Sequence, residues 1–189
     1  MFKRDPGRHV VLSVTFRLAR DRMSRPVGYA ELARRLGVAA GERVPLADAR
    51  AAVLELRRGK GMVLDAGDPD ARSAGSFFTN PVVSPETFSS VQEAARARLG
   101  PAAVVPSFPA AGGQVKIPAA WLIERSGFGK GYDSGTGIRI SAKHTLALVN
   151  PGGGSTKGLL ALAAEIRDGV CASFGIELIP EPVLVGVSL

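Results

Sequence analysis

The sequence predicts a protein of mixed α and β structure, in the α+β class. Residues 155–175 carry apolar side chains at helical spacing, between a serine that can cap a helix and a glycine that can end it. Residues 9–18 alternate between apolar and polar positions, as a half-buried strand does. Shorter β-prone segments occupy 138–140 and 146–149. Together these segments predict a few helices packed with short strands.

The first sixty residues are expected to form a strand followed by two helices. The strand covers 9–18, with valine, leucine and phenylalanine side chains on one face. A short helix over 29–36 is closed by Gly37. A second helix opens at Pro45 and runs to Gly59, because proline suits the first helical position and glycine suits the position after the last.

A turn-rich segment at 65–70 separates this part from the rest of the chain. Its aspartate, glycine and proline residues interrupt any periodic pattern, so we expect a domain boundary after residue 64. Beyond it, Ser84 caps a helix that has Pro85 at its first position and ends near residue 99. The other expected elements are a strand at 115–117, a helix from 118 through 123, a glycine-rich turn at 127–137 and a final strand at 183–187.

The composition is that of an ordinary globular protein, with 46% hydrophobic and 22% charged residues. A chain of 189 residues can bury roughly 70% of its unfolded surface, as one domain or two small ones. The longest uncharged run, 99–115, is broken by prolines, so we expect no membrane-spanning segment. A single cysteine, Cys171, cannot form an internal disulfide, and the first residues include no apolar leader, which favours a cytoplasmic location.

The formal net charge of +7 favours an anionic partner, which by charge alone could be a nucleic acid, an acidic membrane surface or a phosphorylated metabolite. The basic residues are spread along the chain, and two tyrosines and one tryptophan offer no obvious stacking platform for bases. Nucleic-acid binding is therefore disfavoured. Most of the arginines are equally compatible with solvated helix faces.

The segment 72–81 is the most informative about function, because it places the hydroxyl of Ser76 between a glycine and two phenylalanines. Gly75 lets the backbone pass close to a ligand, and the two aromatic rings exclude water. Asn80 precedes Pro81, which holds it in an extended conformation with an amide that can donate and accept. This pattern suits the delivery of one proton in a dry site, although Ser76 alone also fits an ordinary turn serine.

The segment resembles the GSFFxNP motif of the UDP-N-acetylenolpyruvoylglucosamine reductase (UDP-N-acetylmuramate dehydrogenase, MurB) family. The other segments that resemble the family's motifs, in the same order, are 116–124, 127–131, 141–144, 148–150 and 180–181. The resemblance implies an α+β substrate-binding domain and a role in peptidoglycan precursor synthesis. It implies FAD as cofactor, NADPH as reductant and UDP-N-acetylglucosamine enolpyruvate as substrate. Hydride would go to C3 of the enolpyruvyl ether and a proton to C2.

The resemblance assigns two catalytic residues. Ser76 matches the family's proton donor, and Glu181 matches a second catalytic residue held between two prolines. A serine hydroxyl is a weak acid, so its proton transfer must be concerted with formation of the carbanion or relayed through a better acid. A carboxyl beside the substrate carboxylate would stay protonated through like-charge repulsion, and could then donate a hydrogen bond to the developing enolate.

The resemblance also implies that Lys60, Asn80, Phe108 and His144 bind substrate. Lys60 supplies a point charge for a diphosphate or carboxylate, although the end of an exposed helix also favours lysine. Phe108 stands where some family members have a tyrosine, so stacking would survive without the phosphate hydrogen bond; it equally fits a buried loop anchor. A lone histidine such as His144 is more often structural. His9, His144 and Cys171 lack the spacing of metal ligands, so no metal is expected.

The family's main FAD-binding region is not recognisable in the sequence, so its cofactor-binding residues are unknown and we expect a fragment. The expected organisation is the remainder of the FAD-binding domain at 1–64, the substrate-binding domain at 65–178 and a C-terminal strand carrying Glu181 at 179–189. The alternative is a non-catalytic UDP-sugar-binding remnant, or a subunit that needs a separate FAD-binding half.

Overall fold

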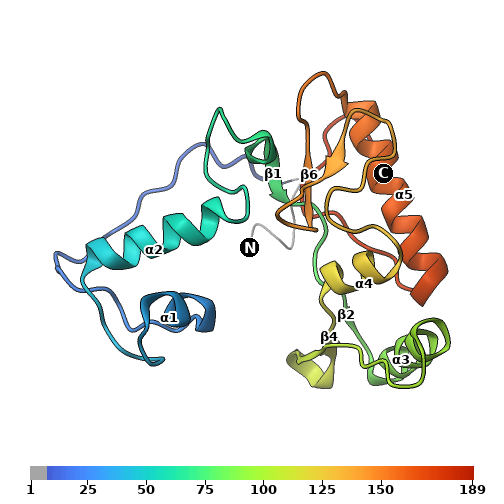
Figure 1. The fold of residues 1–189 in the computed structure, drawn as a ribbon, viewed down its shortest axis with the longest axis horizontal. Coiled ribbons are helices and arrows are strands. Elements are labelled where there is room, and N and C mark those ends of the chain that lie inside the picture. Colours follow the sequence, from blue (N-terminus) through green and yellow to red (C-terminus); the bar gives the residue numbers. More distant parts are fainter. Residues whose placement is uncertain (1–7) are drawn as a thin grey trace. The chain divides into compact units, whose positions relative to one another are not determined.

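The computed structural model describes residues 8–189, which form two compact units (Figure 1). One unit ends at Gly59 and the other covers Lys60–Leu189. Five α-helices and two small antiparallel sheets make up the regular structure of the described residues. The α+β class is therefore confirmed. The functional assignment of 1–64, 65–178 and 179–189 stays a prediction.

The first unit contains the two expected helices, α1 (Ala30–Leu36) and α2 (Leu46–Arg58). The helix α1 ends at Gly37, whose φ of 68° lies in the left-handed region that only glycine adopts without cost. Pro45 precedes α2, as expected. A small apolar cluster, centred on the buried residues Val27, Ala33 and Val44, holds this unit together.

The strand expected at 9–18 is not formed. These residues have no regular structure, and their apolar side chains are exposed, with Val10 at 85% and Leu12 at 91%. Alternation shows which face of a strand could be buried, but a strand also needs a neighbour to accept and donate its backbone hydrogen bonds. Neither sheet of the described chain includes this segment.

The second unit is built on two three-stranded antiparallel sheets. The first has the order β1-β6-β5, from Ser73–Ser76, Ala147–Val149 and Arg139–Ile140. The second has the order β2-β4-β3, from Val82–Val83, Val115–Lys116 and Phe108–Pro109. The expected strands near 115–117, 138–140 and 146–149 are thus confirmed, although each is one residue shorter than expected. The 3-10 turns η1 (Pro69–Ala71) and η2 (Ala111–Gly113) precede β1 and β4.

Three helices pack into the main core: α3 (Pro85–Leu99), α4 (Ala119–Arg125) and α5 (Thr156–Phe174). Both expected caps are present, because the Ser84 hydroxyl accepts the Thr87 N–H at 3.2 Å and the Ser155 hydroxyl accepts the Gly158 N–H at 3.1 Å. The fully buried positions of α5 follow the helical period of the sequence: Leu162, Ala163, Ile166 and Val170. The spacing therefore predicted both the helix and its core face.

The final strand expected at 183–187 is also wrong. Val183 and Val185 are 62% and 86% exposed, and the segment forms bends. Pairing stops at an isolated bridge between Phe78 and Pro180, because Pro180 and Pro182 have no N–H to continue a ladder.

None of the helices in the described part of the chain combines the length and the apolar character that a membrane-spanning helix needs.

Replacing Gly158 with alanine is expected to destabilise the protein by about 1–3 kcal/mol, the usual cost of overpacking a core. Alanine normally stabilises a helix by about 1 kcal/mol relative to glycine. Here, a Cβ on Gly158 would lie 2.5 Å from the backbone oxygen of Thr136. This clash outweighs the helix preference of alanine, so the substitution should destabilise the protein. Urea unfolding measures the change, with Gly129→Ala as control because no atom lies within 4 Å of its Cβ position. A variant as stable as the wild type would contradict this packing argument.

Candidate functional site

The end of β1 brings Ser76 to His144. The Ser76 residue pairs with Ala147 of β6, and the turn that precedes β6 carries His144. The Ser76 Oγ lies 3.3 Å from His144 Nε2, although the two residues are 68 positions apart in the chain. Sheet pairing therefore creates a contact between two of the residues that the sequence singled out separately.

The surroundings of His144 are cationic. Partial burial is the main cause that lowers the pKa of His144 below its ordinary value of 6.5, and the positive charges of Lys60 and Lys130 lower it further. Both effects favour the neutral imidazole. The same two ammonium groups give this part of the molecule a field that attracts an anion, such as a diphosphate or a carboxylate.

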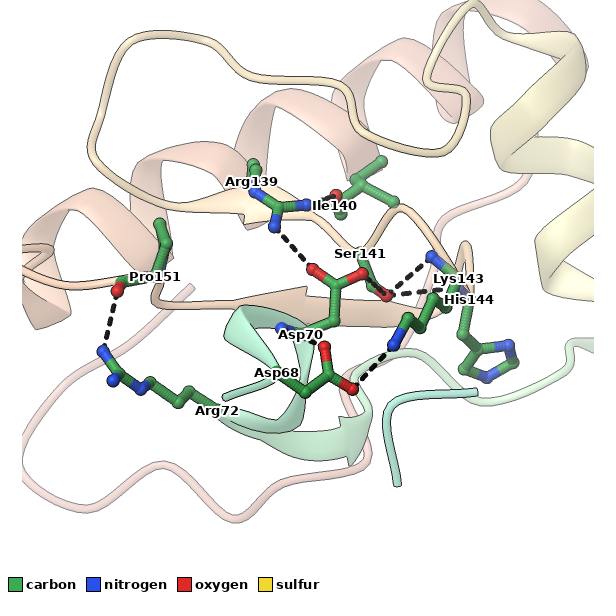
Figure 2. A network of polar contacts seen from close by, with 9 residues as sticks. All are labelled: Asp68, Asp70, Arg72, Arg139, Ile140, Ser141, Lys143, His144 and Pro151. Atoms are coloured by element: carbon green, nitrogen blue, oxygen red, sulfur yellow. Dashed lines mark hydrogen bonds and ion pairs between the residues drawn. The ribbon is translucent and has the colours of Figure 1, made fainter. Parts of the chain in front are cut away.

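A buried hydroxyl shapes the turn that carries His144 (Figure 2). Ser141 is completely buried, and its Oγ accepts the backbone N–H groups of Lys143 at 3.0 Å and His144 at 3.2 Å. The same hydroxyl donates to Asp70 Oδ2 at 3.0 Å. The turn is therefore tied to the carboxylate of a residue in η1.

Asp70 is the centre of this network. It is 2% exposed, and its other carboxylate oxygen lies 2.5 Å from Nη2 of Arg139, which belongs to β5. The neighbouring Asp68 accepts the Asp70 N–H at 3.0 Å and pairs with Lys143 Nζ at 2.7 Å. The hydrogen bond from Lys143 is the main cause that lowers the pKa of Asp68. Figure 2 shows these side chains converging from η1, β5 and the turn before β6.

Glu181 lies beside the strand that ends in Ser76. Its backbone N–H donates to the Phe77 carbonyl at 2.8 Å, next to the bridge between Phe78 and Pro180. The residue itself is exposed. The structure thus places the main chain of Glu181 within one residue of Ser76 along the paired segment.

Asn80 and Phe108 belong to the surroundings of the second sheet. The Asn80 Oδ1 accepts the Ala119 N–H at 2.9 Å, so its amide caps the beginning of α4. Phe108 lies on β3, is 55% exposed, and has Lys116 Nζ 5.9 Å from its ring centroid. The alternative of a buried loop anchor does not hold for Phe108. Substrate contacts for these two residues stay predictions.

A cavity of about 530 Å³ opens along β1, and its lining includes Ser73 and Gly75 of that strand and Phe77, which follows the strand. Its polar rim includes Arg72, which donates to the Pro151 carbonyl at 2.7 Å. The Asn150 Oδ1 accepts the N–H groups of Gly152 and Gly154, both at 3.1 Å, so this glycine turn wraps an asparagine side chain.

Among residues 8–189, no group of three or more His, Cys, Asp or Glu side chains could hold a metal ion.

Sequence reasoning did not single out four of the residues in this arrangement: Asp70, Lys130, Arg139 and Ser141. Lys130 and Ser141 fall inside segments that carry the family resemblance, which was the available signal. Asp70 was interpreted only as part of a turn-rich break. Its two partners, Arg139 and Ser141, lie 69 and 71 positions later in the chain, so no local pattern could show that Asp70 is buried and paired.

Comparison with known proteins assigns the chain to a family. Residues 68–185 match the family model described as UDP-N-acetylenolpyruvoylglucosamine reductase, C-terminal domain. The protein of that name from Thermobifida fusca is 58% identical over 182 residues, which are 96% of this chain and 51% of that protein. The one from Streptomyces coelicolor is 56% identical over 189 residues, 100% of this chain and 49% of that protein. The protein named UDP-N-acetylenolpyruvoylglucosamine reductase 2 from Corynebacterium glutamicum is 48% identical over 187 residues, which are 97% of this chain and 50% of that protein.

Residues 68–185 therefore define the class of the protein, because they match the C-terminal domain of a reductase family. The chain belongs to the UDP-N-acetylenolpyruvoylglucosamine reductase family, and it spans about half the length of the curated relatives that it matches.

Proposed function

We propose that this chain forms the substrate-binding and proton-delivering part of a UDP-N-acetylenolpyruvoylglucosamine reductase. The observation that carries the proposal is the Ser76 hydroxyl, 3.3 Å from a histidine whose surroundings include the cations Lys60 and Lys130. The substrate of such a reductase carries a diphosphate and a carboxylate, which suit a cationic site. The cytoplasmic location expected from the sequence stays a prediction.

The proton step follows from the chemistry of the enolpyruvyl ether. Addition of hydride at C3 leaves a carbanion at C2 next to the carboxylate, and this charge must be stabilised and quenched by a proton. In the proposal, Ser76 Oγ gives its proton to C2 as the carbanion forms, and the resulting serine alkoxide takes up a proton from water. Lys60 and Lys130 balance the negative charge of the bound substrate. Glu181, in its protonated form, would donate a hydrogen bond to the substrate carboxylate.

The proposed reaction needs a hydride carrier, which the resemblance implies to be FAD reduced by NADPH. One feature of the described residues fits a planar ring near Ser76. Gly75 has a φ of 87°, and no atom lies within 4 Å of the position that a Cβ would take there, so this backbone is open to close approach.

The length of the chain favours a second candidate function, because it spans about half of each relative. In that case the chain binds the UDP-sugar without reducing it, or acts with a separate FAD-binding half. Oxidation of NADPH by the purified chain, supplied with FAD and the enolpyruvyl substrate, distinguishes the two. Turnover would exclude the non-catalytic alternative, and binding without turnover would support it.

Substrate binding is the first expected result. Titration calorimetry of the purified chain should detect UDP-N-acetylglucosamine enolpyruvate, and Lys60→Ala or Lys130→Ala should weaken binding by roughly 10- to 100-fold, because hydrogen bonds to charged groups contribute about 1.5–3 kcal/mol. Arg96→Ala is the matched control, since it removes one positive charge from the exposed end of α3. Absence of binding to the folded wild-type chain at millimolar substrate would refute the proposal. Equal losses of affinity in all three variants would show that binding depends on net charge and not on the positions of Lys60 and Lys130.

A further inference from the structure

The contact between Ser76 and His144 has a direction. A serine hydroxyl has one hydrogen and two acceptor lone pairs. If Ser76 is to give its hydrogen to a substrate, that hydrogen must point to the substrate, and the oxygen must then be the acceptor toward His144. The hydrogen in the 3.3 Å contact must therefore belong to Nε2 of the imidazole.

The charged groups around His144 favour a neutral donor. Lys60 and Lys130 act on the ring with positive charge, which disfavours an imidazolium. The acidic residues of the adjoining network are engaged elsewhere, because Asp68 pairs with Lys143 and Asp70 with Arg139. Asp65 acts, like Asp68 and Asp70, on Lys143. The main chain of Glu181 is paired with Phe77. The ring thus donates from its neutral form.

The backbone of His144 is held independently of its side chain. Its N–H donates to Ser141 Oγ at 3.2 Å, and Ser141 in turn donates to the buried carboxylate of Asp70. Asp70 is fixed to β5 through Arg139. A continuous series of polar contacts therefore runs from Arg139 on β5 through Asp70 and Ser141 to the backbone of His144 (Figure 2).

We propose that His144 is a positioning residue for Ser76: its neutral imidazole donates the Nε2 hydrogen to Ser76 Oγ and so turns the serine hydrogen toward the substrate. The network of Asp70, Arg139 and Ser141 sets the place of the imidazole. The role of Ser76 as proton donor rests on the proposed function, whereas the polarity of the hydrogen bond is a property of the chain alone.

The polarity can be read by nitrogen NMR of the whole chain with labelled histidine, because the two nitrogens of a neutral imidazole differ in shift according to which one carries hydrogen. The sequence has only two histidines, so His9→Gln assigns the spectrum. At pH 7.5 we expect His144 to be neutral with hydrogen on Nε2, and to titrate below 6.5. An Nδ1–H tautomer or a cationic ring at that pH would overturn the proposal.

Two variants test the connections. Ser76→Ala should shift the Nε2 resonance of His144 and raise the population of the other tautomer, and Ser141→Ala should do the same through the turn. Ser90→Ala is the matched control, since it removes an exposed hydroxyl that bonds within α3. Unchanged His144 signals in folded Ser76→Ala protein would overturn the proposal even if Ser141→Ala does not fold.

Failure of the proposed function gives a different result. Absence of UDP-sugar binding in calorimetry removes the substrate class but leaves the tautomer measurement intact. If His144 then carries its hydrogen on Nε2 and its signals respond to Ser76→Ala, the positioning role is still supported. If the substrate binds but His144 carries its hydrogen on Nδ1, the proposed function stands and the positioning role is overturned.

Discussion

Replacing Asp70 with alanine is expected to lower the free energy of unfolding by about 3–5 kcal/mol, the usual cost of removing one partner from a buried ion pair. Asp70 is 2% exposed and accepts hydrogen bonds from Arg139 and Ser141. Without the carboxylate, Arg139 keeps a positive charge on a side chain that is 20% exposed, and Ser141 loses its buried acceptor. Urea unfolding of the wild type and the variant measures the difference.

Two further variants separate the causes of this loss. Asp70→Asn keeps an oxygen that can accept from Ser141 but removes the charge, so its loss should be smaller than that of Asp70→Ala. Asp168→Ala is the surface control, because Asp168 is 67% exposed in its pair with Arg167 and exposed pairs contribute less than about 1 kcal/mol. Equal losses for Asp70→Ala and Asp168→Ala would show that burial of the Asp70 pair does not matter for stability.

Replacing Ser76 with alanine is expected to reduce turnover by about 10²–10⁴-fold, the typical contribution of a positioned proton donor. The measurement is the rate of NADPH oxidation with the enolpyruvyl substrate, compared between the variant and the wild type under conditions in which the wild type shows turnover. Substrate affinity in calorimetry should change little, because the proposed role concerns the proton and the cations provide the binding. The loss should therefore fall on kcat, with KM largely unchanged.

The matched control for this experiment is Ser90→Ala, which removes an exposed hydroxyl that bonds within α3. Its removal should leave turnover within a few-fold of the wild type. A Ser76→Ala protein with wild-type kcat would assign the proton to another donor, and a change in KM alone would make Ser76 a binding residue.

The helices were predictable because their signals are local. Ser84 and Ser155 cap α3 and α5 through bonds that reach only three residues along the chain, and the core face of α5 follows from spacing within one helix. The strands at 9–18 and 183–187 were wrong because pairing is a property of two segments. Alternation in one of them says nothing about whether a partner with available N–H and C=O groups exists.

Local sequence signals were enough to predict the family, the α+β class, the helices with their caps, and Ser76 as the candidate proton donor. These rest on motifs and on periodicities within short windows. Three features appear only in the folded chain: His144 faces Ser76, Lys60 and Lys130 act on the same ring, and Asp70 supports the turn behind it. The first and the third of these features depend on the antiparallel register of β1, β6 and β5, which brings together residues far apart in the chain, and no local pattern contains that register.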